Sequence, residues 1–139
     1  MKYEYFPHTA DVKFRAYGSS LEEAFINSAY AYQDVVSDHS KIDCLLEKKI
    51  NVSAEDKKAL LYSFIEEFIV LLDTDSFLLA KIKHLSIKEK KGVFFLSAFV
   101  LGDSDPSKYV INTHVKAMTY QEMSIDEGKR FIIQVVLDI

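Results

Sequence analysis

The segment from Leu60 to Leu72 is the most apolar stretch of the chain, and it constrains the fold more than any other feature. Glu66 and Glu67 interrupt the run, so it does not have the length and uniform hydrophobicity of a membrane-spanning helix. Its apolar residues recur at helical spacing: Leu60, Leu61, Phe64, Ile65, Phe68, Ile69, Leu71 and Leu72. We therefore predict a helix that is capped by Ser53 and lines the core.

A second helix is predicted from Ser20 to near His39. Ser20 is followed three residues later by Glu23, which is the pattern of a capping box. The apolar residues that follow recur at helical spacing and form one stripe: Leu21, Ala24, Phe25, Ala29, Tyr32, Val35 and Val36. This stripe has to be buried, so the helix should pack against a sheet.

The rest of the chain is rich in residues that favour strands. Turns are predicted at 90–92 and 126–128, and loops at 7–11 and 102–108. The predicted strands are 3–6, 12–17, 45–52, 77–89, 93–101, 114–124 and 130–138. Two helices with mainly hairpin-connected strands indicate an α+β fold, in which the helices pack on a mainly antiparallel or mixed twisted sheet.

Length and composition indicate one compact domain spanning residues 1–139. The chain is 49% apolar, which supplies one core, and it has only four Gly and two Pro, with no linker-like stretch. The start MKYEYF lacks an apolar run of signal-peptide length, and Cys44 is the only cysteine, so no internal disulfide can form. We expect a cytoplasmic protein that does not associate with a membrane.

The formal net charge of −4 disfavours tight, direct binding to nucleic acid, because the molecule as a whole repels phosphates. A cluster of basic residues on the predicted hairpin at 77–101 is more typical of a solvated strand edge than of a phosphate-binding surface. No phosphate-binding loop, nucleophile elbow or pair of histidines at metal-ligand spacing is present. The sequence therefore offers no independent catalytic motif.

The first candidate site residues lie in the loop between the first two predicted strands. His8 and Asp11 are held there by strands on both sides, which leaves an imidazole and a carboxylate free to reach a ligand. The alternative is that Thr9 and Asp11 only accept hydrogen bonds from turn amides. Taken alone, the four residues from His8 to Asp11 do not decide between these roles.

The second group of candidates lies towards the C-terminus. Asp138 ends an apolar strand, and Ile139 adds a carbonyl oxygen and a terminal carboxylate, all of which are hard donors suited to Ca²⁺ or Mg²⁺. Lys116 is either a functional cation or a lysine that extends its charge into solvent. The alternative for Asp138 is an ordinary solvated terminal residue.

Four segments together resemble the archease family, in order and across nearly the whole chain. They are PHTADVKFRAYGSSLEEAF, LLYSFIEEFIVLLDTDSF, VKAMTYQEM and VVLDI. The resemblance implies a small cytosolic protein that is not itself an enzyme. It implies that the protein activates an RtcB-type RNA ligase in tRNA splicing, promoting guanylylation of the ligase's histidine and multiple turnover.

The resemblance also assigns roles to particular residues. It implies a divalent cation, with Ca²⁺ expected first and Mg²⁺ or Mn²⁺ as alternatives, bound by the side chains of Asp11 and Asp138 and by the carbonyl of Ile139. Lys116 falls on the lysine of the family's VKA motif, and His8 is a further candidate for partner activation.

Two positions depart from the family pattern: His114 stands where Glu is frequent, and Gln121 stands where His is frequent. The resemblance therefore carries no role over to either residue. Two other functions stay open, a stand-alone metal-dependent hydrolase that uses Asp11, Asp138 and His8, and a chaperone-like protein-interaction module.

Overall fold

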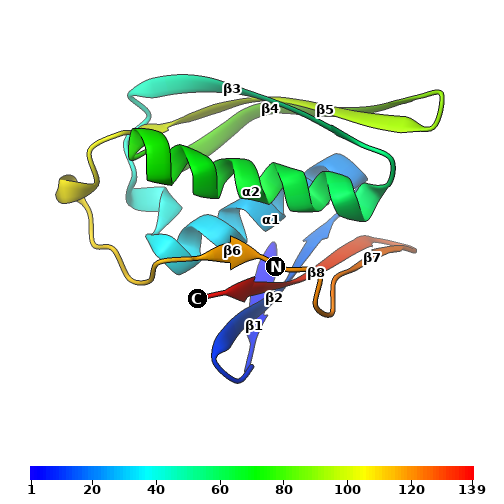
Figure 1. The fold of residues 1–139 in the computed structure, drawn as a ribbon, viewed down its shortest axis with the longest axis horizontal. Helices are drawn as coiled ribbons and strands as arrows, with labels where there is room; N and C mark the ends of the chain where they lie inside the picture. Colours follow the sequence, from blue (N-terminus) through cyan, green and yellow to red (C-terminus); the bar gives the residue numbers. More distant parts are fainter.

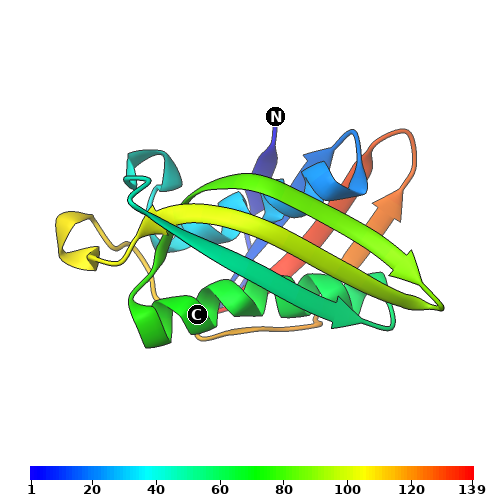
Figure 2. The ribbon, with the colours of Figure 1, turned by 90° about the horizontal axis from the view of Figure 1, so that it is seen from above.

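Two helices, α1 (Leu21–Val36) and α2 (Lys57–Asp75), lie between two sheets in the computed structural model, which describes residues 1–139. Figure 1 shows the layers, with β3, β4 and β5 on one side of the helices and β1, β2 and β8 on the other. Figure 2 shows the long β4–β5 hairpin lying over the helices. Each helix contacts strands of both sheets, so both are buried on two sides. Neither helix is long and apolar enough to cross a membrane.

The larger sheet joins the two ends of the chain. Strand β8 lies beside β2, and β2 lies beside β1. The other edge of β8 is shared by β6, which pairs near its C-terminal end, and β7, which pairs along its first half. The five strands are β1 (Tyr3–Phe6), β2 (Asp11–Gly18), β6 (Ala117–Met118), β7 (Ser124–Glu127) and β8 (Phe131–Asp138).

The smaller sheet has the order β3-β5-β4, formed by β3 (Leu46–Ala54), β4 (Leu78–Lys90) and β5 (Val93–Asp103). Its hairpin turns at Lys91 and Gly92, which have φ values of 51° and 80°. Two consecutive left-handed residues between paired strands are the geometry of a type I′ turn, which matches the right-handed twist of the strands. The predicted turn at residues 90–92 is confirmed.

The core is built around α2, whose buried face follows the predicted apolar pattern. Phe64 is fully buried at the middle of this helix, with its ring centroid 5.9 Å from that of Phe25 on α1 and 5.2 Å from that of Phe68. The predicted fold class is confirmed, since two helices pack on antiparallel sheets in one domain. The sequence did not indicate that the strands divide between two sheets with the helices enclosed.

The N-terminal caps of the two helices differ in how well the sequence predicted them. Ser20 accepts a hydrogen bond from the Glu23 amide at 3.1 Å, so the predicted start of α1 is confirmed. The predicted cap of α2 at Ser53 is wrong, because Asp56 caps this helix by accepting from the Ala59 amide at 2.8 Å. Ser53 lies in β3 opposite Phe95, since pairing with β5 extends the strand past its predicted end.

The strand predicted at 114–124 is also wrong over most of its length, since only Ala117 and Met118 pair as β6. The chain turns after β6, where the Met123 amide donates to the Tyr120 carbonyl at 3.1 Å. The turn predicted at 126–128 lies later, because β7 continues to Glu127 and pairs with β8. Both differences arise because β6 and β7 share one edge of β8.

Candidate functional site

Asp11 and Asp138 lie directly opposite each other in the larger sheet. Asp11 is the first residue of β2, Asp138 is the last residue of β8, and the antiparallel register pairs them. Phe14 and Val135, which are paired in the same register, are fully buried on the core side. Because side chains alternate along strands, Asp11 and Asp138 share the opposite face.

Lys116 and Ile139 adjoin this pair. The Lys116 amide donates to the Asp138 carbonyl at 2.8 Å, and Ala117 pairs with Asp138. Lys116 is exposed, and Ile139 follows Asp138 at the chain end beside β6, as Figure 1 shows. The strand pairing thus brings together four residues that the sequence analysis singled out in three separate segments.

His8 completes the cluster from the β1–β2 loop. Its Nδ1 lies 3.5 Å from Oδ2 of Asp11, and its Nε2 lies 2.7 Å from Oε2 of Glu122. Ala10, which lies between His8 and Asp11 in the sequence, has a left-handed φ of 61° that turns the loop into β2. A non-glycine residue in this region costs about 1–2 kcal/mol, so the surrounding contacts hold the loop in a strained shape.

Glu122 is a site residue that the sequence analysis missed. It lies in the loop between β6 and β7 with a left-handed φ of 53°, and its other oxygen accepts a hydrogen bond from Lys13 at 3.1 Å. The hydrogen bonds from His8 and then from Lys13 hold the pKa of the Glu122 carboxyl below its ordinary value. No sequence signal marks this residue, because His8 and Glu122 are 114 positions apart.

The site opens onto a shallow depression of about 460 Å³. Its polar lining includes His8, Asp11, Asp34 and Thr113. Asp11 is therefore reachable from solvent, with 24% of its side chain exposed. A ligand in the depression would meet a carboxylate and an imidazole held by the sheet.

The ligand atoms of His8, Asp11 and Asp138 are not all close enough to form a three-residue cluster. The only group of three or more His, Cys, Asp or Glu residues whose ligand atoms lie within 4.8 Å of one another is Asp34, Asp38 and His39. The register thus brings the backbones of Asp11 and Asp138 together, and the side chains of His8 and Asp11 are in contact at 3.5 Å.

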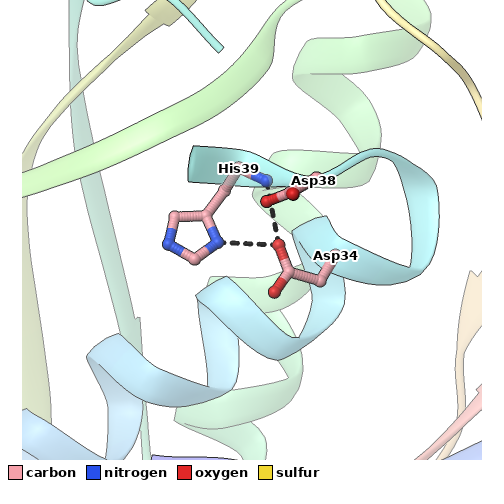
Figure 3. A group of neighbouring side chains, drawn as sticks. All are labelled: Asp34, Asp38 and His39. Atoms are coloured by element: carbon pink, nitrogen blue, oxygen red, sulfur yellow. Dashed lines mark hydrogen bonds and ion pairs between the residues drawn. The ribbon is translucent and has the colours of Figure 1, made fainter. Parts of the chain in front are cut away.

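The Asp34 cluster is explained by its hydrogen bonds, of which Figure 3 shows the two between Asp34 and His39. Oδ1 of Asp34 accepts from the backbone amide of His39 at 2.9 Å and from its Nδ1 at 2.7 Å, and Oδ2 accepts from the Tyr3 hydroxyl. Asp38 accepts from the amide and hydroxyl of Ser40 at 3.0 and 2.7 Å. These contacts lock the chain as it leaves α1, so the cluster is a structural network.

Electrostatics support this structural role of Asp34. Burial by itself raises the pKa of the Asp34 carboxyl, but hydrogen bonds from His39 and Tyr3 outweigh it and hold this pKa below its ordinary value. The His39 ring also stacks on Tyr30, with ring centroids 4.3 Å apart. The ionised carboxylate is thus the form that the fold stabilises.

The fold and the site define a class of protein: a small α+β domain with two helices enclosed between antiparallel sheets and a polar site where the first and last long strands meet. Residues 3–139 match the model of the Archease protein family (MTH1598/TM1083). The chain belongs to the archease family, and the resemblance seen in its four motifs is confirmed.

Similar proteins agree with this assignment. The chain is 39% identical to a Sulfurisphaera tokodaii protein and 38% identical to a Pyrococcus furiosus protein, both named protein archease, with 99% of each chain covered. The solution structure of Methanobacterium thermoautotrophicum protein 1598 superposes with a TM-score of 0.85 at 32% identity, over 99% of both chains. The similarity therefore covers the whole domain, including the first loop and the last strand.

Proposed function

We propose that this protein is a non-catalytic activator of an RtcB-type RNA ligase in the cytoplasm. It promotes guanylylation of the ligase's own histidine and so multiple turnover in tRNA splicing, while the bond-forming chemistry belongs to the ligase. The observation that carries this proposal is membership of the archease family over residues 3–139. The overall negative charge is in keeping with a protein partner rather than direct, tight RNA binding.

The activating surface, in this proposal, includes a divalent cation held by Asp11, Asp138 and the carbonyl of Ile139. The direct pairing of Asp11 with Asp138 supports this, because opposed residues in a sheet have Cβ atoms about 4.5–5.5 Å apart, and their carboxylates can meet at one ion. Oxygen donors of this kind fit Ca²⁺, with Mg²⁺ or Mn²⁺ as alternatives.

The residues around the cation would divide the remaining work. The bound ion supplies positive charge that attracts phosphate oxygens at the ligase surface. Lys116, exposed beside Asp138, adds a second cation to the same face. The contact between His8 and Glu122 holds the β1–β2 loop, which leads into Asp11, against the β6–β7 loop.

Multiple-turnover RNA ligation by the cognate ligase, with GTP and a divalent metal, tests the proposal. Reactions without addition are compared with reactions that contain wild type, Asp11→Asn or Asp126→Asn. Asp126 is an exposed carboxylate on β7 of the same sheet and serves as the matched control. Stimulation by wild type and Asp126→Asn, but not by Asp11→Asn, is expected.

Two results would contradict the proposal at different levels. Equal stimulation by all three proteins would keep the activator function and remove Asp11 from it. No stimulation by wild type would refute the activator function, and turnover of a phosphoester substrate without ligase would instead favour the hydrolase.

A further inference from the structure

The His8 imidazole has one nitrogen whose hydrogen-bonding capacity is unused. Its Nδ1 is buried and has no hydrogen-bond partner, and it is the only buried side-chain nitrogen or oxygen in this state in residues 1–139. Leaving a buried polar atom unpaired costs about 1–3 kcal/mol. A buried ring nitrogen without a partner is therefore a candidate to bind a ligand.

Glu122 decides which nitrogen carries the proton. Nε2 lies 2.7 Å from Oε2 of Glu122, and an ionised carboxylate can only accept, so Nε2–H donates. In the neutral ring, Nδ1 then carries the lone pair. A histidine whose far N–H donates to a carboxylate is the usual arrangement of a metal ligand, because the carboxylate fixes the tautomer and makes the ring a better donor.

The lone pair of Nδ1 faces a second electron-rich atom. Oδ2 of Asp11 lies 3.5 Å away, beyond the range of a normal N–H···O hydrogen bond. The same separation suits two ligands of one ion. If a cation lies about 2.1 Å from each of the two atoms, their 3.5 Å separation corresponds to a ligand–metal–ligand angle of about 110°. A cation between the two atoms would offset the repulsion between their lone pairs and would give Nδ1 a partner.

We propose that Nδ1 of His8 is a ligand of the cation site that contains Asp11, with Glu122 as the residue that positions the ring. The ligand atoms of His8, Asp11 and Asp138 are not all within 4.8 Å of one another, so the Asp138 side chain has to turn towards the His8–Asp11 pair for all three to bind one ion. A site that adds an imidazole to these oxygens prefers a first-row transition-metal dication to Ca²⁺, because imidazole nitrogen is a softer donor than carboxylate or carbonyl oxygen. This inference rests on the cation site of the proposed function and names an additional ligand and the metal class.

The competing explanation is that His8 is an imidazolium that bridges two carboxylates. In that case Glu122 and Asp11 would each form an ion pair with the ring, and a metal would displace a proton rather than fill a ready site. This arrangement predicts no metal-to-histidine bond, so the two explanations differ in a measurable way.

Metal affinity is measured first, by calorimetry with Co²⁺ or Ca²⁺ on the metal-free protein of residues 1–139. His8→Asn replaces the nitrogen donor by an oxygen donor near the same place, and His84→Asn, an exposed histidine on β4 of the other sheet, is the matched control. Wild type and His84→Asn should bind Co²⁺ more tightly than Ca²⁺. His8→Asn should lose Co²⁺ affinity by about tenfold or more, with a much smaller change for Ca²⁺.

Pulsed electron paramagnetic resonance of the Mn²⁺-loaded proteins then asks whether a nitrogen is bound. Imidazole ¹⁴N coupling is expected in wild type and His84→Asn and should be absent in His8→Asn. If His8→Asn does not fold, as judged by circular dichroism, Glu122→Gln takes its place and should weaken Co²⁺ binding more than Ca²⁺ binding. Absence of the nitrogen signal in wild type, or equal weakening of both metals, would overturn the proposal.

The ligation assay separates this inference from the proposed function. If wild type stimulates the ligase while His8→Asn binds Co²⁺ as wild type does, the activator function stands and the His8 ligand is refuted. If His8 proves to be a ligand while wild type fails to stimulate the ligase, the His8 ligand stands and the activator function is refuted. Wild type that binds neither metal would refute the cation site and His8's part in it.

Discussion

Gly102 on β5 is a position where one added methyl group should strongly destabilise the fold. Gly102 is buried and pairs with Leu79 at the start of β4. A Cβ on this residue would lie 2.0 Å from the carbonyl oxygen of Leu78 and 2.6 Å from Cζ of Phe77. Non-bonded atoms pack at about 3.5–4.0 Å, so Gly102→Ala requires the strands to separate by about 1 Å or more.

The expected cost follows from how little these neighbours can move. Leu78 is fully buried and Phe77 is 2% exposed, so neither can move into solvent. Overpacking a core costs about 1–3 kcal/mol, and more where backbone must shift. The shift also strains the hydrogen bond from the Leu45 amide to the Gly102 carbonyl, worth about 0.5–1.5 kcal/mol. We expect Gly102→Ala to lower the free energy of unfolding by about 3–4 kcal/mol, which corresponds to a fall in Tm of about 10 °C.

Urea unfolding followed by circular dichroism measures this loss. Gly92→Ala is the control, since Gly92 lies in the β4–β5 turn with open space around its missing Cβ and a φ of 80°. The free energy of unfolding of this control should fall by only about 1 kcal/mol, because the added methyl group meets no neighbour and disfavours only the left-handed backbone. If Gly102→Ala loses no more free energy of unfolding than Gly92→Ala, the steric argument is refuted.

Two further predictions concern Asp34 and Phe64. Because its folded pKa is below the ordinary value, ionised Asp34 stabilises the fold at neutral pH, and this contribution is lost as pH falls through that pKa. Asp34→Asn should therefore cost about 1–3 kcal/mol of free energy of unfolding at pH 7 and progressively less as the pH falls through the folded pKa; chemical unfolding at neutral and at acid pH checks this, and a cost independent of pH would contradict it. Phe64→Ala should cost about 3–5 kcal/mol, because this fully buried ring packs edge-on to Phe68; a loss below about 1 kcal/mol in the same assay would contradict it.

The two helix starts show where sequence reasoning succeeds and where it fails. The signal at Ser20 and Glu23 lies within four residues, so the start of α1 could be predicted: Ser20 accepts from the Glu23 amide, while the Glu23 carboxylate accepts from the Ser19 amide instead of the Ser20 amide. Ser53 and Asp56 are both good caps, and the choice between them depends on how far β3 pairs with β5. That pairing is made by residues that are distant in sequence, so the local pattern does not contain it.

The candidate site divides in the same way. Asp11 and Asp138 were both identified as oxygen donors from their places next to predicted strands, but their direct opposition depends on the register of β2 and β8. Glu122 has no local mark, because its role arises when the β6–β7 loop folds against His8. A role that depends on a partner more than a hundred residues away becomes visible only in three dimensions.

The sequence by itself determined the helical periodicity of α1 and α2, the turn at Lys91 and Gly92, the α+β class and the archease motifs. These features are decided by interactions within a few residues or by residue identity. The tertiary structure alone decided that the strands form two sheets around the helices, that β6 and β7 share one edge of β8, and that His8 faces Asp11. The physical reason is that a strand needs a partner and a buried stripe needs a surface, and both are chosen by long-range packing.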